Sequence, residues 1–290
     1  MYMKIQNILF FIALSVIISG CAGDKEPKVE VAALDDEVSG EASQKIMDFF
    51  LEGYNDDGTK KWDVKGDSAD MLPDNTVKIL KVDANGYGKD NSINLTADTG
   101  VLNRDTNDVH LEKNVVAVTK DRGRLLTDWL DYHAEREEIT TDAFVKLTKD
   151  NMVVTGTGAV TEPGMNKARL NKYVTAIMKK EGSNETTTIT CDGILDVFYK
   201  KNMAVFNDNV KVADNKGFVY ADRMEVHYNS DAREIKNIFA TGNVSIIRDD
   251  NVTYSQKAKY VADEERLVLS GVRPRVVFYA EEADSAFTEY

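Results

Sequence analysis

The feature that most constrains this chain is a short-range alternation of apolar and polar residues. Stretches such as 76–84 and 217–228 place an apolar side chain at about every second position. This period marks β-strands that bury one face. Clusters of Asn, Asp and Gly, as at 55–58 and 214–217, separate the stretches. Because these residues tolerate the left-handed backbone of hairpin turns, the sequence predicts an all-β meander of antiparallel strands.

Two segments leave the secondary structure open. Residues 42–51 fit either a short helix or the lead-in to a strand, and residues 166–180 are the one later stretch in which helical periodicity is an alternative. Neither segment changes the predicted fold class.

The predicted strands also repeat. One element, a short apolar segment followed by Asp, ends at Asp98, Asp128, Asp192 and Asp222. Asp98 and Asp128 are 30 residues apart, and so are Asp192 and Asp222. A second element, Asn-Val followed by alternation, begins at Asn114, Asn209 and Asn243, with a weaker copy at 143–147. Any chain of even hairpins looks periodic, but the shared Asp and Asn-Val positions indicate stacked units with one apolar interior.

The N-terminus predicts export. Lys4 precedes an apolar run at 8–18, which as a helix would cover about 16 Å, too little to cross a bilayer. Ser19, Gly20 and Cys21 follow, which completes the pattern of a secretory signal peptide. Residues 18–21 resemble a bacterial lipobox, which implies cleavage before Cys21 and attachment of acyl chains, palmitate among them, to that cysteine. An ordinary signal peptide with an incidental cysteine is the alternative.

The remaining segments divide at changes of composition. The predicted order is a lipoprotein signal peptide (1–20), an acidic tether (21–43), a first β domain (44–180), a second β domain (186–280) and a frayed tail (281–290). The boundary is the polar stretch 178–185, which has little apolar content.

Charge and residue types exclude several function classes. The chain has 49 acidic and 36 basic residues and a net charge of -13, which disfavours nucleic acid as a partner. Two cysteines provide no disulfide framework and no four-cysteine zinc site, and we expect Cys191 to be an ordinary buried thiol. The histidines, His110, His133 and His227, lie in separate segments without metal-binding spacing. We therefore expect no metal, no cofactor and no enzymatic activity.

Two sets of phrases resemble known families. Residues 237–246, preceded by 220–228 and followed by 258–260 and 267–276, resemble the OstA/LptA family of periplasmic lipopolysaccharide-transport proteins. In the first half, the resemblance is to the LptC family, the membrane-anchored proteins that receive lipopolysaccharide from an inner-membrane ABC transporter. The phrases that carry it are 49–54, 61–69, Thr96-Ala-Asp, Asn114-Val and 154–158. Together the resemblances cover nearly all of residues 44–279.

The resemblance implies two consecutive β-jellyrolls, each an open V-shaped sandwich with apolar inner faces, that join other OstA-like domains through their edge strands. It implies a component of the envelope bridge that holds lipopolysaccharide by its acyl chains and is anchored in the periplasm. The inner membrane is favoured as the anchoring membrane, and the outer membrane is the alternative, because the best-known LptC-type proteins use a transmembrane helix instead of a lipid. A structural or adhesive envelope lipoprotein is the alternative function.

Candidates for the lipid-contacting face are the residues that repeat the same period-two phase in successive units. They are Val115, Ala117, Val145, Leu147, Val210, Val212, Val244 and Ile246. The same residues would serve equally well as a closed, dry core. In either case, the sugar and phosphate groups of a bound lipid are expected to stay in solvent, so the acidic protein buries no anion.

Overall fold

The computed structural model describes residues 44–278 with short gaps. The gaps are 56, 88–91, 121–122, 137, 162–166, 180–183, 230–233, 249–250, 265 and 272–273. Within the described ranges the chain is almost entirely β-strand, and its helical content is one 3₁₀ turn, Tyr199–Lys201. The all-β prediction is confirmed. The predicted signal peptide, the tether with Cys21, and the tail lie outside the described residues.

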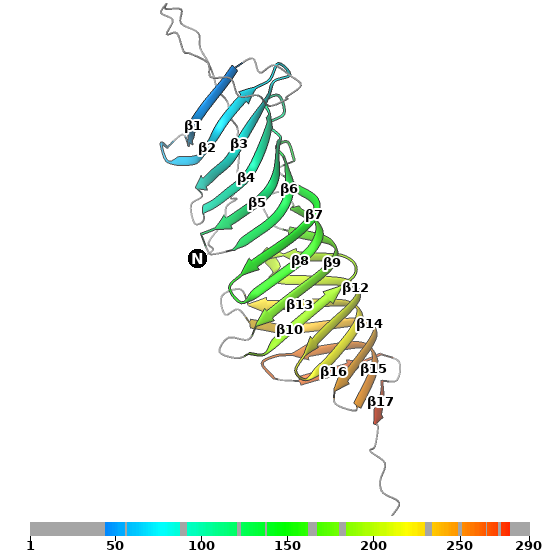
Figure 1. Ribbon diagram of the computed structural model, residues 1–290. Coiled ribbons are helices and arrows are strands. Elements are labelled where there is room, and N and C mark those ends of the chain that lie inside the picture. Colours follow the sequence, from blue (N-terminus) through cyan, green and yellow to red (C-terminus); the bar gives the residue numbers. More distant parts are fainter. Residues whose placement is uncertain are drawn as a thin grey trace, which may run out of the picture.

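The strands follow one another along the chain and down the molecule (Figure 1). In the first half they are β1 (Gln44–Tyr54), β2 (Lys60–Met71), β3 (Thr76–Tyr87), β4 (Ser92–Asn103), β5 (Val109–Thr119), β6 (Arg124–His133), β7 (Glu138–Lys149), β8 (Met152–Thr161) and β9 (Lys167–Lys179). In the second half they are β10 (Thr186–Cys191), β11 (Leu195–Phe198), β12 (Met203–Asp214), β13 (Gly217–Asn229), β14 (Glu234–Arg248), β15 (Asn251–Val261), β16 (Arg266–Ser270) and β17 (Arg275–Phe278).

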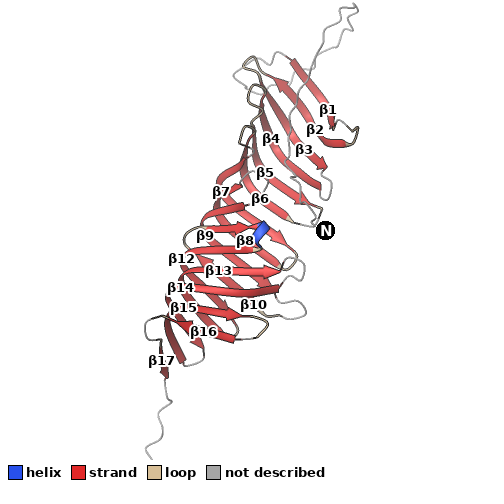
Figure 2. Ribbon diagram, turned by 180° about the vertical axis from the view of Figure 1, so that it is seen from behind, coloured by secondary structure: helices blue, strands red, loops and turns tan. Residues whose placement is uncertain are grey.

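The strands form one antiparallel sheet in which, apart from two pairs of short strands, each strand pairs with its neighbours in the chain. The short strands β10 and β11 together occupy one position, because both pair with β9 on one side and with β12 on the other. Likewise β16 and β17 pair with the two ends of β15. The view from behind shows the same unbroken succession (Figure 2).

The two segments whose secondary structure the sequence left undecided both form strands. β1 begins at Gln44, and β9 covers the stretch for which a helix was the alternative. In β9 the buried residues are Leu170, Val174 and Ala176. Tyr173, between the first two, has a positive φ of 55°. The buried residues keep the same period-two phase, but Lys172 between the first two is exposed, and the register with β8 shifts there. Successive buried residues are therefore four apart from 170 to 174, a spacing that a helix also produces.

Strands across the sheet bend at comparable positions, and the repeated sequence elements build the bends. Asn114, Asn209 and Asn243 all have positive φ, and the strand register shifts at each of them. Each of these side-chain amides donates a hydrogen bond to an Asp, which lies on the preceding strand or, for Asp192, directly after the end of β10. The pairs are Asn114 to Asp98 at 2.6 Å, Asn209 to Asp192 at 2.8 Å and Asn243 to Asp222 at 3.0 Å. The two repeating elements are therefore hydrogen-bonded partners.

The weaker repeat lacks this pair. Phe144 stands where the other units have Asn, and only the register shift between Thr141 and Phe144 remains. A bend of the sheet can therefore form without the pair, although the chain uses the pair three times among the described strands.

The buried residues form two apolar clusters. One extends from Phe49 to Leu130, and the other from Val145 to Ala258. The second cluster contains residues from both sides of the polar stretch 178–185, and β9 pairs with β10 across that stretch. The sheet and the core therefore run through the segment that was predicted as a domain boundary.

Candidate functional site

The eight residues predicted from the repeat phase lie at two levels of the strands. Val115, Val145, Val210 and Val244 are at the bends, and none exposes more than 1% of its surface. They are enclosed by packing, so they contribute core rather than accessible surface.

The second level lies two residues further along each strand. Ala117, Leu147 and Val212 are partly exposed, whereas Ile246 is 5% exposed. Residues two apart in a strand point to the same face, so both levels belong to one inner face of the bent sheet. Of the eight predicted residues, Ala117, Leu147 and Val212 are the ones that a bound molecule could reach.

The residues of the second level are part of one continuous apolar row that crosses the sheet. Its members lie directly opposite one another in successive strands, from β1 to β14. They are Leu51, Val64, Ala84, Leu95, Ala117, Leu125, Leu147, Val154, Ala176, Ile189, Val212, Val219 and Ile246. No polar residue interrupts the row, and its next position, on β15, is Thr253.

The row crosses the junction between β9 and β10 without a break, and a second row does the same on the other side of the bends. There Leu195 of β11 lies opposite Leu170 of β9 and Phe206 of β12, and all three are at most 5% exposed. Burial on this scale stabilises each large apolar side chain by roughly 1.5–3 kcal/mol, so the junction is a packed core.

Some apolar side chains pack against this core yet remain partly exposed. In the first row they include Leu125, Leu147, Val212 and Val219. Partly exposed apolar residues that repeat along one face form an apolar strip, which is the kind of surface that hydrocarbon chains contact.

The structure tests the prediction for Cys191 but not the one for Cys21. Cys21 lies outside the described residues, so its lipidation stays a prediction. Cys191 is buried, as predicted, and burial raises the pKa of its thiol to about 11, which keeps it protonated at neutral pH. In the described part of the chain, no helix is long and apolar enough to cross a membrane.

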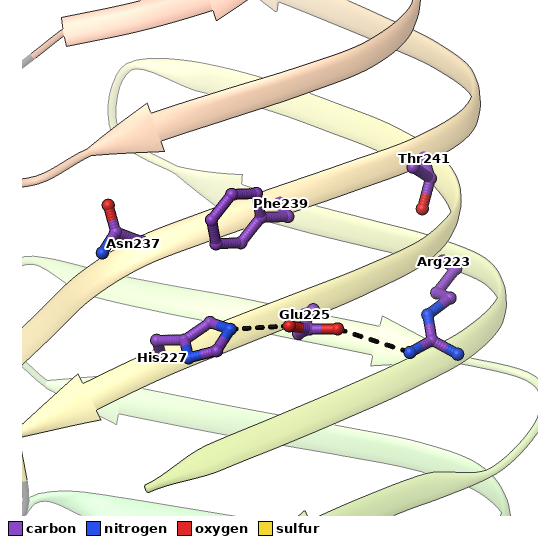
Figure 3. Close-up of a pocket in the computed structure, with 6 residues that line it drawn as sticks. All are labelled: Arg223, Glu225, His227, Asn237, Phe239 and Thr241. Carbon is purple, nitrogen blue, oxygen red and sulfur yellow. Dashed lines mark hydrogen bonds and ion pairs between the residues drawn. The ribbon is translucent and has the colours of Figure 1, made fainter. Parts of the chain in front are cut away.

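A shallow depression lies on the opposite, outer face of β13 and β14 (Figure 3). It has a volume of about 570 Å³ and is lined by Arg223, Glu225, His227, Asn237, Phe239 and Thr241. These side chains alternate with the inward residues Met224, Val226 and Ala240, so strand geometry places them on the outer face.

A hydrogen-bonded row crosses this depression. Glu225 accepts from Nε2 of His227 at 2.6 Å and from Arg223 at 3.4 Å. The hydrogen bond from His227, with a further contribution from Arg223, holds the pKa of Glu225 below its ordinary value. Since an ionised carboxylate only accepts hydrogen bonds, Nε2 of His227 carries the proton.

His227 belongs to the alternating stretch 217–228 and lies on the outer face of β13, but the sequence did not predict the depression. The available signal was the alternation of Arg223, Glu225 and His227 at every second position. The partners on β14 could not be assigned from the sequence, because strand register brings Thr241, Phe239 and Asn237 opposite them.

Other polar groups are structural. Asp63 is 5% exposed and accepts hydrogen bonds from Asn85 and Tyr87, both at 2.8 Å, and from Lys60 at 3.3 Å. His110 contacts Asp131 at 2.7 Å, and His133 contacts Thr140 at 3.2 Å. In the described ranges, no three His, Cys, Asp or Glu side chains gather in a metal-binding arrangement.

Comparison with protein families gives two adjoining matches. Residues 9–179 match the family described as lipopolysaccharide-assembly, LptC-related. Residues 188–285 match the family described as LptA/(LptD N-terminal domain) LPS transport protein. A search of curated proteins found no match. The LptC match covers more than half of the chain, and the two matches stand in tandem on a continuous all-β sheet. The chain therefore belongs to the LptC-related lipopolysaccharide-assembly family and carries an LptA-type domain fused behind its LptC-type domain.

Proposed function

We propose that this protein is a lipopolysaccharide-binding component of the envelope bridge that moves the lipid from an inner-membrane ABC transporter toward the outer membrane. The observation that carries the proposal is the apolar row from Leu51 to Ile246, which crosses the junction of the two matched domains in unbroken register. A lipid moving along this row would meet no polar step at the junction.

The partly exposed members of the row provide the affinity in this proposal. Transfer of an acyl chain onto Leu125, Leu147 and Val212 is favourable by about 0.8 kcal/mol for each methylene that is buried. The sugar and phosphate groups stay outside the apolar row, which avoids the cost of burying an anion among apolar side chains. Binding and release of this kind need no nucleophile or general base, so we propose that the protein is not an enzyme.

The ends of the sheet suit connection to other bridge components. β1 at one end and β16 with β17 at the other have one edge without a strand partner in the described part of the chain. Exposed apolar residues lie on these end strands, including Met47 and Phe50 on β1 and Val268 on β16. Edge strands of this kind pair readily with a further strand, so we propose that OstA-like domains join here. Acyl chains on Cys21 would hold the complex in the periplasm, at the inner membrane.

Site-specific photo-crosslinking in cells tests the proposal. A photoreactive residue at Val212 or Leu147 is expected to form lipopolysaccharide adducts, because both side chains are partly exposed on the inner face. Lys211 is the matched control, since it is the neighbour of Val212 and points to the outer face. Position 244 is expected to label weakly, because Val244 is 1% exposed.

The outcomes separate the two candidate functions. Adducts at 211 as strong as those at 212 would contradict binding on the inner face. If a folded protein gave no adducts at any inner position, the chain would be a structural envelope lipoprotein instead.

A further inference from the structure

The outer-face depression carries more positive than negative charge, although the chain as a whole is acidic. Among the residues that the structure describes, Glu225 is the one carboxylate that lines it. Arg223 lies within the depression, and two exposed lysines border it on β15, since Lys257 pairs with Thr241 and Lys259 pairs with Phe239. The nearby carboxylate of Asp222 accepts the Asn243 amide at the bend. This surplus of positive charge favours an anionic group as the ligand.

Hydrogen-bond donors in the depression remain available. One guanidinium nitrogen of Arg223 faces Glu225, and the side chain is 50% exposed, so its other N–H groups can reach a ligand. Asn237 and Thr241 add an amide and a hydroxyl at the two ends of the lining (Figure 3). A planar guanidinium beside amide and hydroxyl groups suits a phosphate oxygen next to sugar hydroxyls.

Phe239 gives the depression a flat apolar floor. His227 meets its ring edge-on, with the centroids 5.5 Å apart, and the Nζ atom of Lys259 lies 5.4 Å from the ring centroid. These contacts fix the ring orientation. An aromatic ring held among polar groups is a surface on which the apolar face of a sugar ring can stack.

The position of the depression links it to the inner face. His227 is two residues, or about 7 Å of extended strand, from the end of β13 at Asn229. Its neighbour Val226 belongs to the inner apolar core. A headgroup that leaves the inner face past the strand end can therefore fold over onto the outer face.

We propose that the outer face of β13, β14 and β15 binds a phosphorylated saccharide, supplied by the headgroup of the lipid whose acyl chains lie on the inner face. Arg223 and Lys259 contact the phosphate, and the ring of Phe239 contacts the sugar. This inference rests on the proposed function, because that function provides the lipid.

The test uses the full chain in detergent and a water-soluble probe, the phosphorylated oligosaccharide obtained by completely deacylating lipopolysaccharide. Isothermal titration is expected to detect binding, and Arg223→Gln is expected to weaken it about tenfold, which is typical for the loss of a charge-assisted hydrogen bond. Arg275→Gln is the matched control, because Arg275 is an exposed arginine that lies over Tyr254 on a different part of the sheet. That control is expected to leave binding unchanged.

Two further probes separate the sources of the signal. Removing the phosphates from the oligosaccharide is expected to weaken binding. Inorganic phosphate alone is expected to bind much more weakly than the oligosaccharide, and equal affinity would overturn the saccharide part of the inference. Equal binding by the Arg223→Gln protein and the unmodified protein would overturn all of it.

Crosslinking at 212 distinguishes this inference from the proposed function. Lipopolysaccharide adducts at 212 combined with no effect of Arg223→Gln would refute the outer site and leave the transport proposal intact. Absence of adducts at every inner position of the folded protein would refute the transport proposal itself.

Discussion

Asn243 of β14 donates its side-chain amide to both carboxylate oxygens of Asp222 on β13, at distances of 3.2 and 3.0 Å. The backbone of Asn243 is left-handed, with a φ of 45°, and the register of β14 against β15 shifts at the same place. Asn is the side chain that best tolerates this backbone while reaching a neighbour, so one residue type both bends the strand and ties it to the strand before.

Replacement of Asn209, the equivalent residue of β12, separates the contribution of the left-handed backbone to stability from that of the side-chain hydrogen bond. Asn209→Val is expected to lower the free energy of unfolding by about 2 kcal/mol, because a β-branched residue is strained at a φ of 50° and the bond to Asp192 is lost. Asn209→Gly loses only the bond, and about 1 kcal/mol is expected. Urea unfolding checks both, and equal losses would contradict a backbone contribution.

The shared core predicts that the two matched domains unfold together. Leu195 lies in the LptA-type domain and is 3% exposed, and its neighbour Leu170 lies in the LptC-type domain. Leu195→Ala is expected to cost about 2–5 kcal/mol. Both tryptophans, Trp62 and Trp129, belong to the LptC-type domain, so their fluorescence should report the shift.

A control for that experiment lies at the far end of the sheet. Leu269→Ala on β16 removes a partly buried leucine far from the junction, and a smaller shift is expected. A tryptophan transition that does not move in Leu195→Ala would show that the domains unfold independently.

Close packing of Trp62 on Gly53 predicts a strong effect of a single methyl group. A Cβ atom at Gly53 would lie within 2.4 Å of the Trp62 indole. Gly53→Ala therefore forces the indole out of its buried position, where it is 8% exposed, and a cost of about 1–3 kcal/mol is expected. Tryptophan emission should shift to longer wavelength. Unchanged emission would contradict this packing.

The carboxylate of Asp63 is expected to make the stability of the folded protein decrease at acid pH. Burial alone would raise the pKa of its carboxyl group, but hydrogen bonds from Asn85, Tyr87 and Lys60 outweigh it and hold the pKa below its ordinary value. The stabilisation is therefore present above the ordinary carboxyl range near pH ~4 and is lost as the pH falls through the lower folded-state pKa.

The matched experiment is Asp63→Asn, followed by chemical unfolding at several pH values. The variant is expected to be less stable than the unmodified protein at pH 7, and the difference should shrink as the pH falls below about 4. A difference that stays constant with pH would contradict this role of Asp63.

Much of the fold could be predicted because its signals are local. Alternation within one strand defines which residues share a face, so Val210 and Val212 were placed together correctly. Turn residues such as Gly217 mark the hairpins, since their φ preferences do not depend on distant contacts. The exception was β9, where exposed Lys172 interrupts the alternation and leaves buried Leu170 and Val174 four residues apart, as in a helix.

Tertiary structure decided what depends on strand register. The sequence by itself determined the strands, the turns, the repeat and the apolar face. It could not determine that Val115 is enclosed at a bend while Ala117 is partly exposed, or that Asn243 bonds to Asp222. Nor could it place Phe239 opposite Glu225. These relationships join residues from different strands, and they are fixed only when cross-strand pairing sets the register and the bends.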